Sequence, residues 1–187
     1  MTLLQRIGVR APKALAAGLL FLAVGATAAT AVSKHAPRAD ESWTTYKNER
    51  FGYTLYYPAA IFDTAEAREG GAGQNFVTRD GRTKIVVFGT LNAENFSPQE
   101  YRRVILREFG GYDRMDYSPS GQSWFVLSGF RGDNIYYQKV MFSCGNKVIN
   151  VFSMTFPTAE KSLYEGYIET MEDHFKAGRG QDTPQGC

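Results

Sequence analysis

Apolar and polar residues alternate in several short stretches of the chain, and each of these stretches predicts a β-strand. In the first, Tyr53, Leu55 and Tyr57 share one face, and Pro58 ends the strand because proline has no N–H to donate. The "KNERFG" before it indicates a turn, so residues 46–62 are expected to form a hairpin that begins a sheet. Further strands are expected at residues 75–78, 83–91, 113–117, 122–130, 134–145 and 147–156.

A helix is predicted in "SPQEYRRVILREFGG". Ser97 is a suitable N-cap, Pro98 suits the first helical position, and Glu100 completes a capping box with Ser97. Gly110 can take the left-handed conformation that ends a helix. The apolar residues share one face and the arginines point away from it: Tyr101, Val104, Ile105 and Phe109 on one side, and Arg102, Arg103 and Arg107 on the other.

A second helix is predicted from Thr158, acting as its cap, to about Lys176, and Gly178 follows as its stop. Its apolar stripe consists of Leu163, Tyr164, Tyr167, Ile168, Met171 and Phe175. This helix would follow the last strand directly and pack its stripe on the sheet.

The turn "GN" at residues 145–146 would set the register of the last two strands if it is a two-residue hairpin. The pairs would then be Phe142 with Ile149 and Val140 with Val151 on one face, and Ile135, Tyr137 and Met141 with Phe156, Met154 and Asn150 on the other. Both faces are largely apolar, so both must be covered. The sequence therefore predicts an α+β fold, an antiparallel β-sheet covered by helices on its faces.

The first 31 residues have the order of a secretory signal peptide. Three basic residues and no acid come first, then the apolar run "ALAAGLLFLAV", then small residues. Cleavage is expected after Ala31, so that the mature protein begins at Val32, with Ala28 as the other candidate position. Retention of the leader as a membrane anchor is the alternative. The rest divides into a flexible tail at 32–42, a single domain at 43–178 and a C-terminal tail at 179–187.

Removal of this leader changes the charge of the protein. The whole chain has 21 Lys and Arg against 19 Asp and Glu, but the leader holds three of the basic residues, Arg6, Arg10 and Lys13. The mature chain therefore carries one excess acid. A nearly neutral chain has no electrostatic signature of nucleic-acid or anionic-lipid binding, so a membrane contact is expected only if the leader stays uncleaved.

Taken together, the "FGYTLYYP" hairpin, the "SPQEYRRVI" helix, the long strands and the terminal "LYEGYIETMEDHF" helix resemble the PsbP-like superfamily. This family is named for an extrinsic subunit of photosystem II and has Ran-binding and bacterial envelope relatives. The resemblance covers residues 43–176 and rests on the order of elements. It implies an α/β/α sandwich and a non-enzymatic accessory or binding role. It transfers no site residues, and the bacterial-type export signal argues against a photosystem role.

Few residues suit catalysis or metal binding. The two histidines, His35 in the tail and His174 in the last helical turn, are far apart in the sequence. The chain has no G-x-S-x-G, S-x-x-K, P-loop or H-E-x-x-H motif, and no dinucleotide-binding glycine pattern. Two cysteines and two distant histidines do not make a zinc site. We therefore expect no cofactor and no metal.

The two cysteines leave three possibilities open. The last strand runs about 33 Å away from the turn at residues 145–146, and the last helix returns about 26 Å, which brings the chain end near Cys144. An oxidising compartment would then favour a Cys144–Cys187 disulfide. Alternatively both thiols are free, or Cys144 is a nucleophile paired with His174 and oriented by Asp173 or Glu172.

Three further patterns have simple structural interpretations. Arg131-Gly132-Asp133 is expected to form a turn between strands, and Asn95-Phe96-Ser97 is discounted as a glycosylation acceptor because Ser97 is needed as a helix cap. One tyrosine of Tyr56-Tyr57 and one of Tyr136-Tyr137 should lie in the core, although such pairs could also line a binding groove. We expect an exported, periplasmic or extracellular, non-enzymatic protein that binds an envelope protein or small ligand. The alternatives are the Cys144 enzyme and a membrane-tethered component.

Overall fold

The computed structural model describes residues 42–108 and 111–187. Within these residues, nine strands form two antiparallel sheets. The smaller sheet pairs β1 (Trp43–Lys47) with β2 (Thr54–Pro58). The larger sheet has the order β3-β4-β5-β9-β8-β7-β6. Its strands are β3 (Phe62–Ala67), β4 (Gly73–Thr78), β5 (Lys84–Leu91), β6 (Arg114–Tyr117), β7 (Trp124–Arg131), β8 (Asn134–Ser143) and β9 (Val148–Pro157). The predicted leader, its cleavage at Ala31–Val32, and residues 32–41 of the predicted tail lie outside the described residues.

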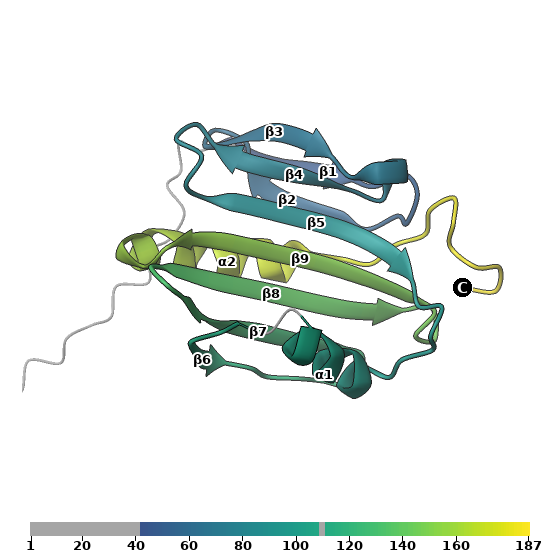
Figure 1. Cartoon of the computed structure of the whole chain (residues 1–187). Coiled ribbons are helices and arrows are strands. Elements are labelled where there is room, and N and C mark those ends of the chain that lie inside the picture. The colour runs from purple at the N-terminus through teal and green to yellow at the C-terminus, as the bar shows by residue number, and fades with distance from the viewer. Residues whose placement is uncertain (1–41, 109–110) are drawn as a thin grey trace, which may run out of the picture. The chain divides into compact units, whose positions relative to one another are not determined.

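The register predicted for the last hairpin is confirmed at every pair. Phe142 lies opposite Ile149 and Val140 opposite Val151, and Ile135 faces Phe156 across the same two strands. Gly145 and Asn146 both have positive φ, at 59° and 68°, as a two-residue turn of this type requires. The hairpin β8–β9 forms the centre of the sheet (Figure 1).

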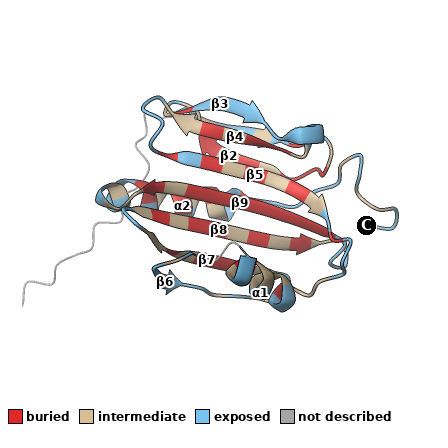
Figure 2. Ribbon diagram, in the orientation of Figure 1, coloured by how far each residue is buried: buried red, intermediate tan, exposed pale blue. Residues whose placement is uncertain are grey.

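One face of the large sheet is covered by α2 (Lys161–His174), which lies behind β8 and β9 in Figure 1. The β1–β2 sheet packs beside α2 on the same face. Thr54 of β2 exchanges backbone hydrogen bonds with Lys176, just past the end of the helix. The core on this side is buried in Figure 2 and is rich in aromatic residues, among them Phe51, Tyr53, Tyr57, Phe76, Phe152, Phe156, Tyr164, Tyr167 and Phe175. We call this the α2 face.

The opposite face carries α1 (Pro98–Glu108), and we call it the α1 face. The predicted capping box is present: the Ser97 N–H and hydroxyl donate to Glu100 Oε2 at 2.8 and 2.7 Å, and the Glu100 N–H donates to Ser97 Oγ at 3.3 Å. These hydrogen bonds lower the pKa of Glu100. The helix packs Ile105 onto a second cluster made of Phe125, Leu127, Val140, Phe142, Ile149 and Val151. Phe109 and Gly110, predicted on the apolar face and at the helix end, lie outside the described residues.

The α+β class with helices on both faces of an antiparallel sheet is therefore confirmed. Three details differ from expectation. The opening hairpin forms its own sheet, because its apolar side packs on the core beside α2. Strand β3 was not expected, because only Phe62 at its start is buried and the rest carries no alternation. The last helix starts as a 3₁₀ turn at Thr158–Glu160 with no side-chain cap, and α2 ends at His174.

The segment 179–187, predicted as a C-terminal tail, lies along the loop between β1 and β2. The Gln181 N–H donates to Glu49 O at 3.0 Å and the Asp182 N–H to Arg50 O at 2.8 Å. The chain reaches this loop by passing close over Gly52, where a Cβ on Gly178 would lie 2.0 Å from the Gly52 oxygen. Gly178 therefore permits a close backbone approach rather than ending the helix directly.

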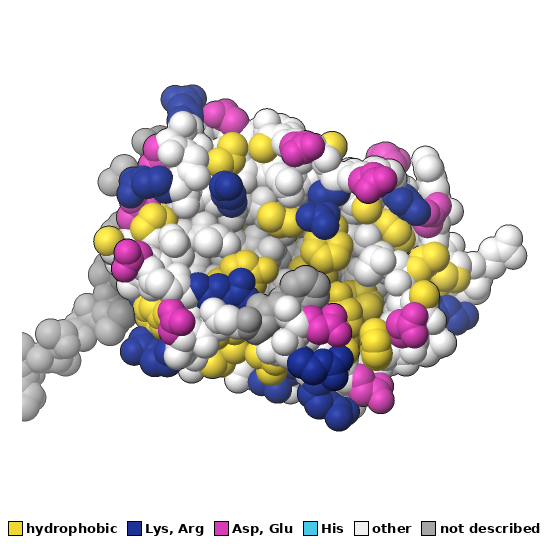
Figure 3. Space-filling model, viewed as in Figure 1, with side chains coloured by type: hydrophobic (Ala, Val, Ile, Leu, Met, Phe, Trp, Pro, Cys, Tyr) yellow, Lys and Arg dark blue, Asp and Glu magenta, His cyan; other side chains and the backbone are white. Residues whose placement is uncertain are grey.

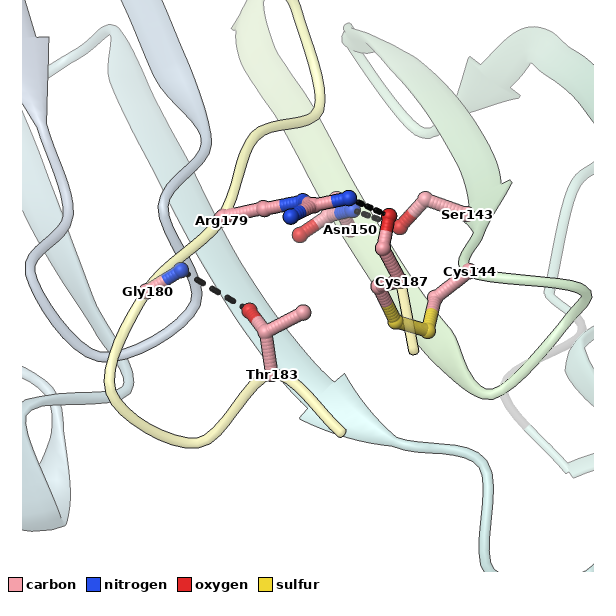
Figure 4. Close-up of a disulfide and its surroundings, with 7 residues drawn as sticks. All are labelled: Ser143, Cys144, Asn150, Arg179, Gly180, Thr183 and Cys187. Atoms are coloured by element: carbon pink, nitrogen blue, oxygen red, sulfur yellow. Dashed lines mark hydrogen bonds between the residues drawn. A yellow bond between two sulfur atoms is a disulfide. The ribbon is translucent and has the colours of Figure 1, made fainter. Parts of the chain in front are cut away.

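The end of this segment is joined to the sheet by the disulfide between Cys144 and Cys187 (Figure 4). Cys144 follows β8, and its Cα lies 5.0 Å from that of Cys187. Arg179 donates a hydrogen bond to the backbone oxygen of Cys187, and the Gly180 N–H donates to Thr183 Oγ1 at 2.8 Å. The disulfide attaches the segment to the β8–β9 turn, and the two hydrogen bonds hold the segment's own conformation.

Buried tyrosines make the protein sensitive to alkali. Burial is the main cause that raises the pKa of Tyr53, Tyr112 and Tyr137 far above the usual value. The pKa of these tyrosines is higher in the folded protein than in the unfolded chain, where it is about 10. Their contribution to the free energy of unfolding is therefore fully present below about pH 10 and is lost as the pH rises above it. We expect the tyrosinate absorbance of these residues to appear only together with loss of the circular dichroism of the fold. Full tyrosinate absorbance with unchanged circular dichroism would contradict this.

Candidate functional site

Helix α1 leaves part of the α1 face uncovered, and a groove of about 410 Å³ lies there. Strands β5, β8 and β9 form its floor. Its lining is Lys84, Val86 and Phe88 of β5, Tyr136 and Gln138 of β8, Ser153 and Thr155 of β9, Tyr101 and Ile105 of α1, and Arg68 and Arg131 from loops and strand ends. We call it the open-face groove. Figure 3 views this face, with Lys and Arg side chains beside an area of hydrophobic and uncharged side chains.

A row of polar side chains crosses the floor of the groove. Asn75 of β4 pairs with Val86, Val86 pairs with Ser153, and Ser153 pairs with Gln138. Cross-strand partners point to the same face, so the polar side chains Asn75, Ser153 and Gln138 lie in one line across the sheet. Ser153 is 5% exposed and Gln138 is 8% exposed. Polar residues so deeply placed in a central part of a sheet are uncommon.

Two oxygens of this row have no hydrogen-bond partner among the described residues. They are Asn75 Oδ1 and Gln138 Oε1, and both are buried from solvent. Ser153 is satisfied, since its hydroxyl donates to Val86 O at 3.4 Å. A buried acceptor without a donor costs about 1–3 kcal/mol of stability. Gln138 lines the groove, so we interpret its unpaired oxygen as a hydrogen-bond acceptor for a ligand, because it does not stabilise the fold.

The charged side chains that line the groove are all basic. Its lining includes Arg68, Lys84 and Arg131 and no carboxylate. The guanidinium of Arg131 lies over the rings of Tyr112 and Tyr136, 4.7 and 4.3 Å from their centroids. The guanidinium of Arg68 lies 4.7 Å over the ring of Phe88. Stacking on aromatic rings holds both guanidinium planes in fixed positions at the groove.

A second, larger groove of about 610 Å³ lies on the α2 face between β8 and α2. Most of its lining is uncharged, and α2 contributes three acids, Glu165, Glu169 and Glu172. Beside the groove, Tyr137, Lys139 and Glu172 form a network. The Tyr137 hydroxyl donates to Glu172 Oε2 at 2.6 Å, and Lys139 Nζ lies 3.2 Å from Glu172 Oε1. This network is internally satisfied, so it fixes α2 on the sheet.

The residues considered for cysteine catalysis are not assembled for it. The sulfur of Cys144 is bonded to Cys187. The ring of His174 lies against that of Tyr56, tilted by 45° with 5.2 Å between centroids, and its Nδ1 lies 2.8 Å from Thr170 O. Glu172, proposed to orient the histidine, is bonded to Tyr137 and Lys139 instead.

The other sequence patterns find structural roles. Gly132, at φ 54°, and Asp133 form the β7–β8 turn, and Arg131 is the last residue of β7. Of the two tyrosine pairs, Tyr57 and Tyr137 are buried and their neighbours are half-buried, as predicted. The sequence analysis did not predict the groove. The pattern that could have indicated it is the presence of the polar residues Gln138 and Ser153 within otherwise largely apolar strands. Among residues 42–108 and 111–187, no helix could cross a membrane and no cluster of three or more candidate side chains could hold a metal.

Comparison of the sequence with known protein families gives no match, and comparison with curated protein sequences gives none either. Solved structures do show similarity. Cyanobacterial PsbP (CyanoP) from Synechocystis sp. PCC 6803 is similar over 73% of this chain and 93% of its own, with a TM-score of 0.52 and 11% identity. The Ran-binding protein Mog1p of Saccharomyces cerevisiae is similar over 74% and 97%, with a TM-score of 0.53 and 12% identity.

These similarities establish the fold, and at such low identity they establish nothing further. The described part of the chain has the PsbP-like fold that its order of elements predicts. The function of the groove must therefore be inferred from the chemistry of the residues that line it.

Proposed function

We propose that this chain is an exported, non-enzymatic binding protein of the cell envelope, and that its ligand occupies the open-face groove. The observation that carries the proposal is Gln138, which lines a groove of about 410 Å³ and whose buried Oε1 has no partner among the described residues. Ligand pockets commonly combine an apolar lining with a few well-placed polar groups, and this groove does so. The fold shared with Mog1p, described as a Ran-binding protein, is consistent with a binding role.

Two features support export. The leader has the order of a secretory signal, with cleavage expected after Ala31. The Cys144–Cys187 disulfide suits an oxidising compartment such as the periplasm. A retained leader would instead make the protein a membrane-tethered envelope component. Its N-terminal sequence after export distinguishes the two, because a chain beginning upstream of Ala26 would keep the anchor.

The test is the native mass of the protein purified from its own envelope fraction. We expect a mass beyond that of the polypeptide, lost on denaturation. Thr155→Trp places a large ring in the groove and should remove the extra mass. Ser162→Trp, on the exposed side of α2, is the matched control and should retain it.

Two outcomes would overturn the proposal. A bare polypeptide mass for the unaltered protein means that no small ligand is bound in the envelope. An extra mass that survives in Thr155→Trp places the ligand elsewhere.

A further inference from the structure

The open-face groove also indicates the chemistry of its ligand. We propose that it binds a saccharide that carries a carboxylate or a phosphate. This inference rests on the proposed function, because it concerns the same groove.

The charge of the groove selects an anion. Among the described residues, the ion pairs of the protein include none with Arg68 or Lys84, and the lining has no acid. Asp80, the acid nearest in the sequence to Lys84, is paired with Arg82, and Glu66 and Glu69, which lie on either side of Arg68 in the sequence, form no ion pair with it among the described residues. Within the described residues, Arg68 and Lys84 therefore have no ion-pair partner. An arginine and a lysine that converge on one groove suit a carboxylate or a phosphate.

The unpaired acceptor requires a donor on the same ligand. Gln138 Oε1 can only be satisfied by an N–H or O–H group that reaches the floor of the groove. An ammonium group is excluded as that donor, because Arg68, Lys84 and Arg131 would repel it. A neutral hydroxyl or a neutral amide N–H meets no such repulsion, and we assign the hydroxyl because the rest of the lining suits a sugar ring. The proposed ligand thus combines an anionic group with hydroxyl groups.

The remaining lining suits a sugar ring. Tyr101, Tyr136, Phe88 and Val86 supply apolar surface next to the polar row. A pyranose has apolar C–H faces and a hydroxyl edge, so it can contact the rings while its hydroxyls reach Gln138 and Thr155. The volume of about 410 Å³ lies in the range of small-molecule sites.

The test is calorimetric titration of the protein, produced from the full chain, with digalacturonate and with glucose 6-phosphate. Glucose tests the need for the anion, inorganic phosphate tests the need for the sugar, and adenosine monophosphate tests for a nucleotide. We expect at least one of the two acidic saccharides to bind at least tenfold more tightly than the three comparison compounds. Binding should weaken as salt is added, because the cations are solvent-accessible.

Three variants locate the binding. Lys84→Gln should weaken it about tenfold or more, as expected for one lost bond to a charged group. Gln138→Met keeps the size of the side chain, removes the acceptor and should also weaken binding, while the circular dichroism of the fold stays unchanged. Lys161→Gln, on α2 beside the other groove, removes a charge of the same sign and should leave affinity unchanged.

The possible failures are distinguishable. If the native protein carries an extra mass but neither acidic saccharide binds, the saccharide assignment is wrong and the binding function stands. If inorganic phosphate or the nucleotide binds as tightly as the saccharides, the sugar is not recognised. If Lys84→Gln and Lys161→Gln behave alike, the saccharide binds outside the groove. If no native ligand and no probe binds, both proposals fail.

Discussion

Replacing Cys144 and Cys187 together by serine should lower the free energy of unfolding by about 4 kcal/mol. The bond closes a loop with a sequence separation of 43 residues. In the chain-entropy model, a loop of this length restricts the unfolded chain by about 4 kcal/mol. The loop contains β9 and α2, so the unfolded ensemble that the bond constrains includes the central strand and the helix on the α2 face. The measurement is urea unfolding of the unaltered and substituted proteins under oxidising conditions.

The unaltered protein, unfolded after reduction, shows whether the loss comes from the missing bond or from the serine side chains. Reduction should lower its free energy of unfolding by a similar amount. Native protein should also resist alkylation until it is reduced. Equal stability of the oxidised and substituted proteins, together with ready alkylation, would show free thiols. That result would restore Cys144 as a candidate nucleophile.

Met171→Ala should cost about 3 kcal/mol of stability, whereas Leu163→Ala should change it by less than about 0.5 kcal/mol. Both residues belong to the apolar stripe predicted on the last helix. In the structure Met171 is fully buried at 0% exposure, and Leu163 is 42% exposed. Truncation of Met171 therefore leaves a cavity between α2 and the sheet, and truncation of Leu163 removes only a solvent-exposed side chain.

The same denaturation measurement tests this pair. Each variant controls the other for helix propensity, because both place an alanine in α2. Similar losses at both positions would mean that Leu163 is covered in solution, by a partner or by a second copy. A negligible loss at Met171 would contradict the packing of α2 on the sheet.

The groove exists because the helix on its face is short. An α1 of 11 residues is about 16 Å long, and a strand of 10 residues such as β8 is about 33 Å long. One helix of this length cannot cover the strands from end to end. The apolar half of the α1 face, around Phe125 and Phe142, lies under the helix, and the polar row with Ser153 and Gln138 lies beyond it. The apolar part of each strand thus lies under α1, and the polar part lies where α1 does not cover the sheet.

Local sequence determines a large part of this fold. The capping box of Ser97 and Glu100 and the turn at Gly145-Asn146 depend on residues within a few positions of one another. Once that turn is set, the register of β8 and β9 follows from the period of two along each strand. The proximity of Cys144 and Cys187 also follows, because strand and helix lengths are set by rise per residue.

The remaining features depend on contacts between distant segments. The β1–β2 hairpin has the alternation of any strand pair, and only its packing beside α2 separates it from the large sheet. The open-face groove joins Arg68, Lys84 and Gln138, which no local pattern brings together. Sequence alone therefore determined the cap of α1, the β8–β9 turn and the central register, since these depend on local interactions. Tertiary packing decided which polar residues are buried and left without partners, since burial depends on what covers each face.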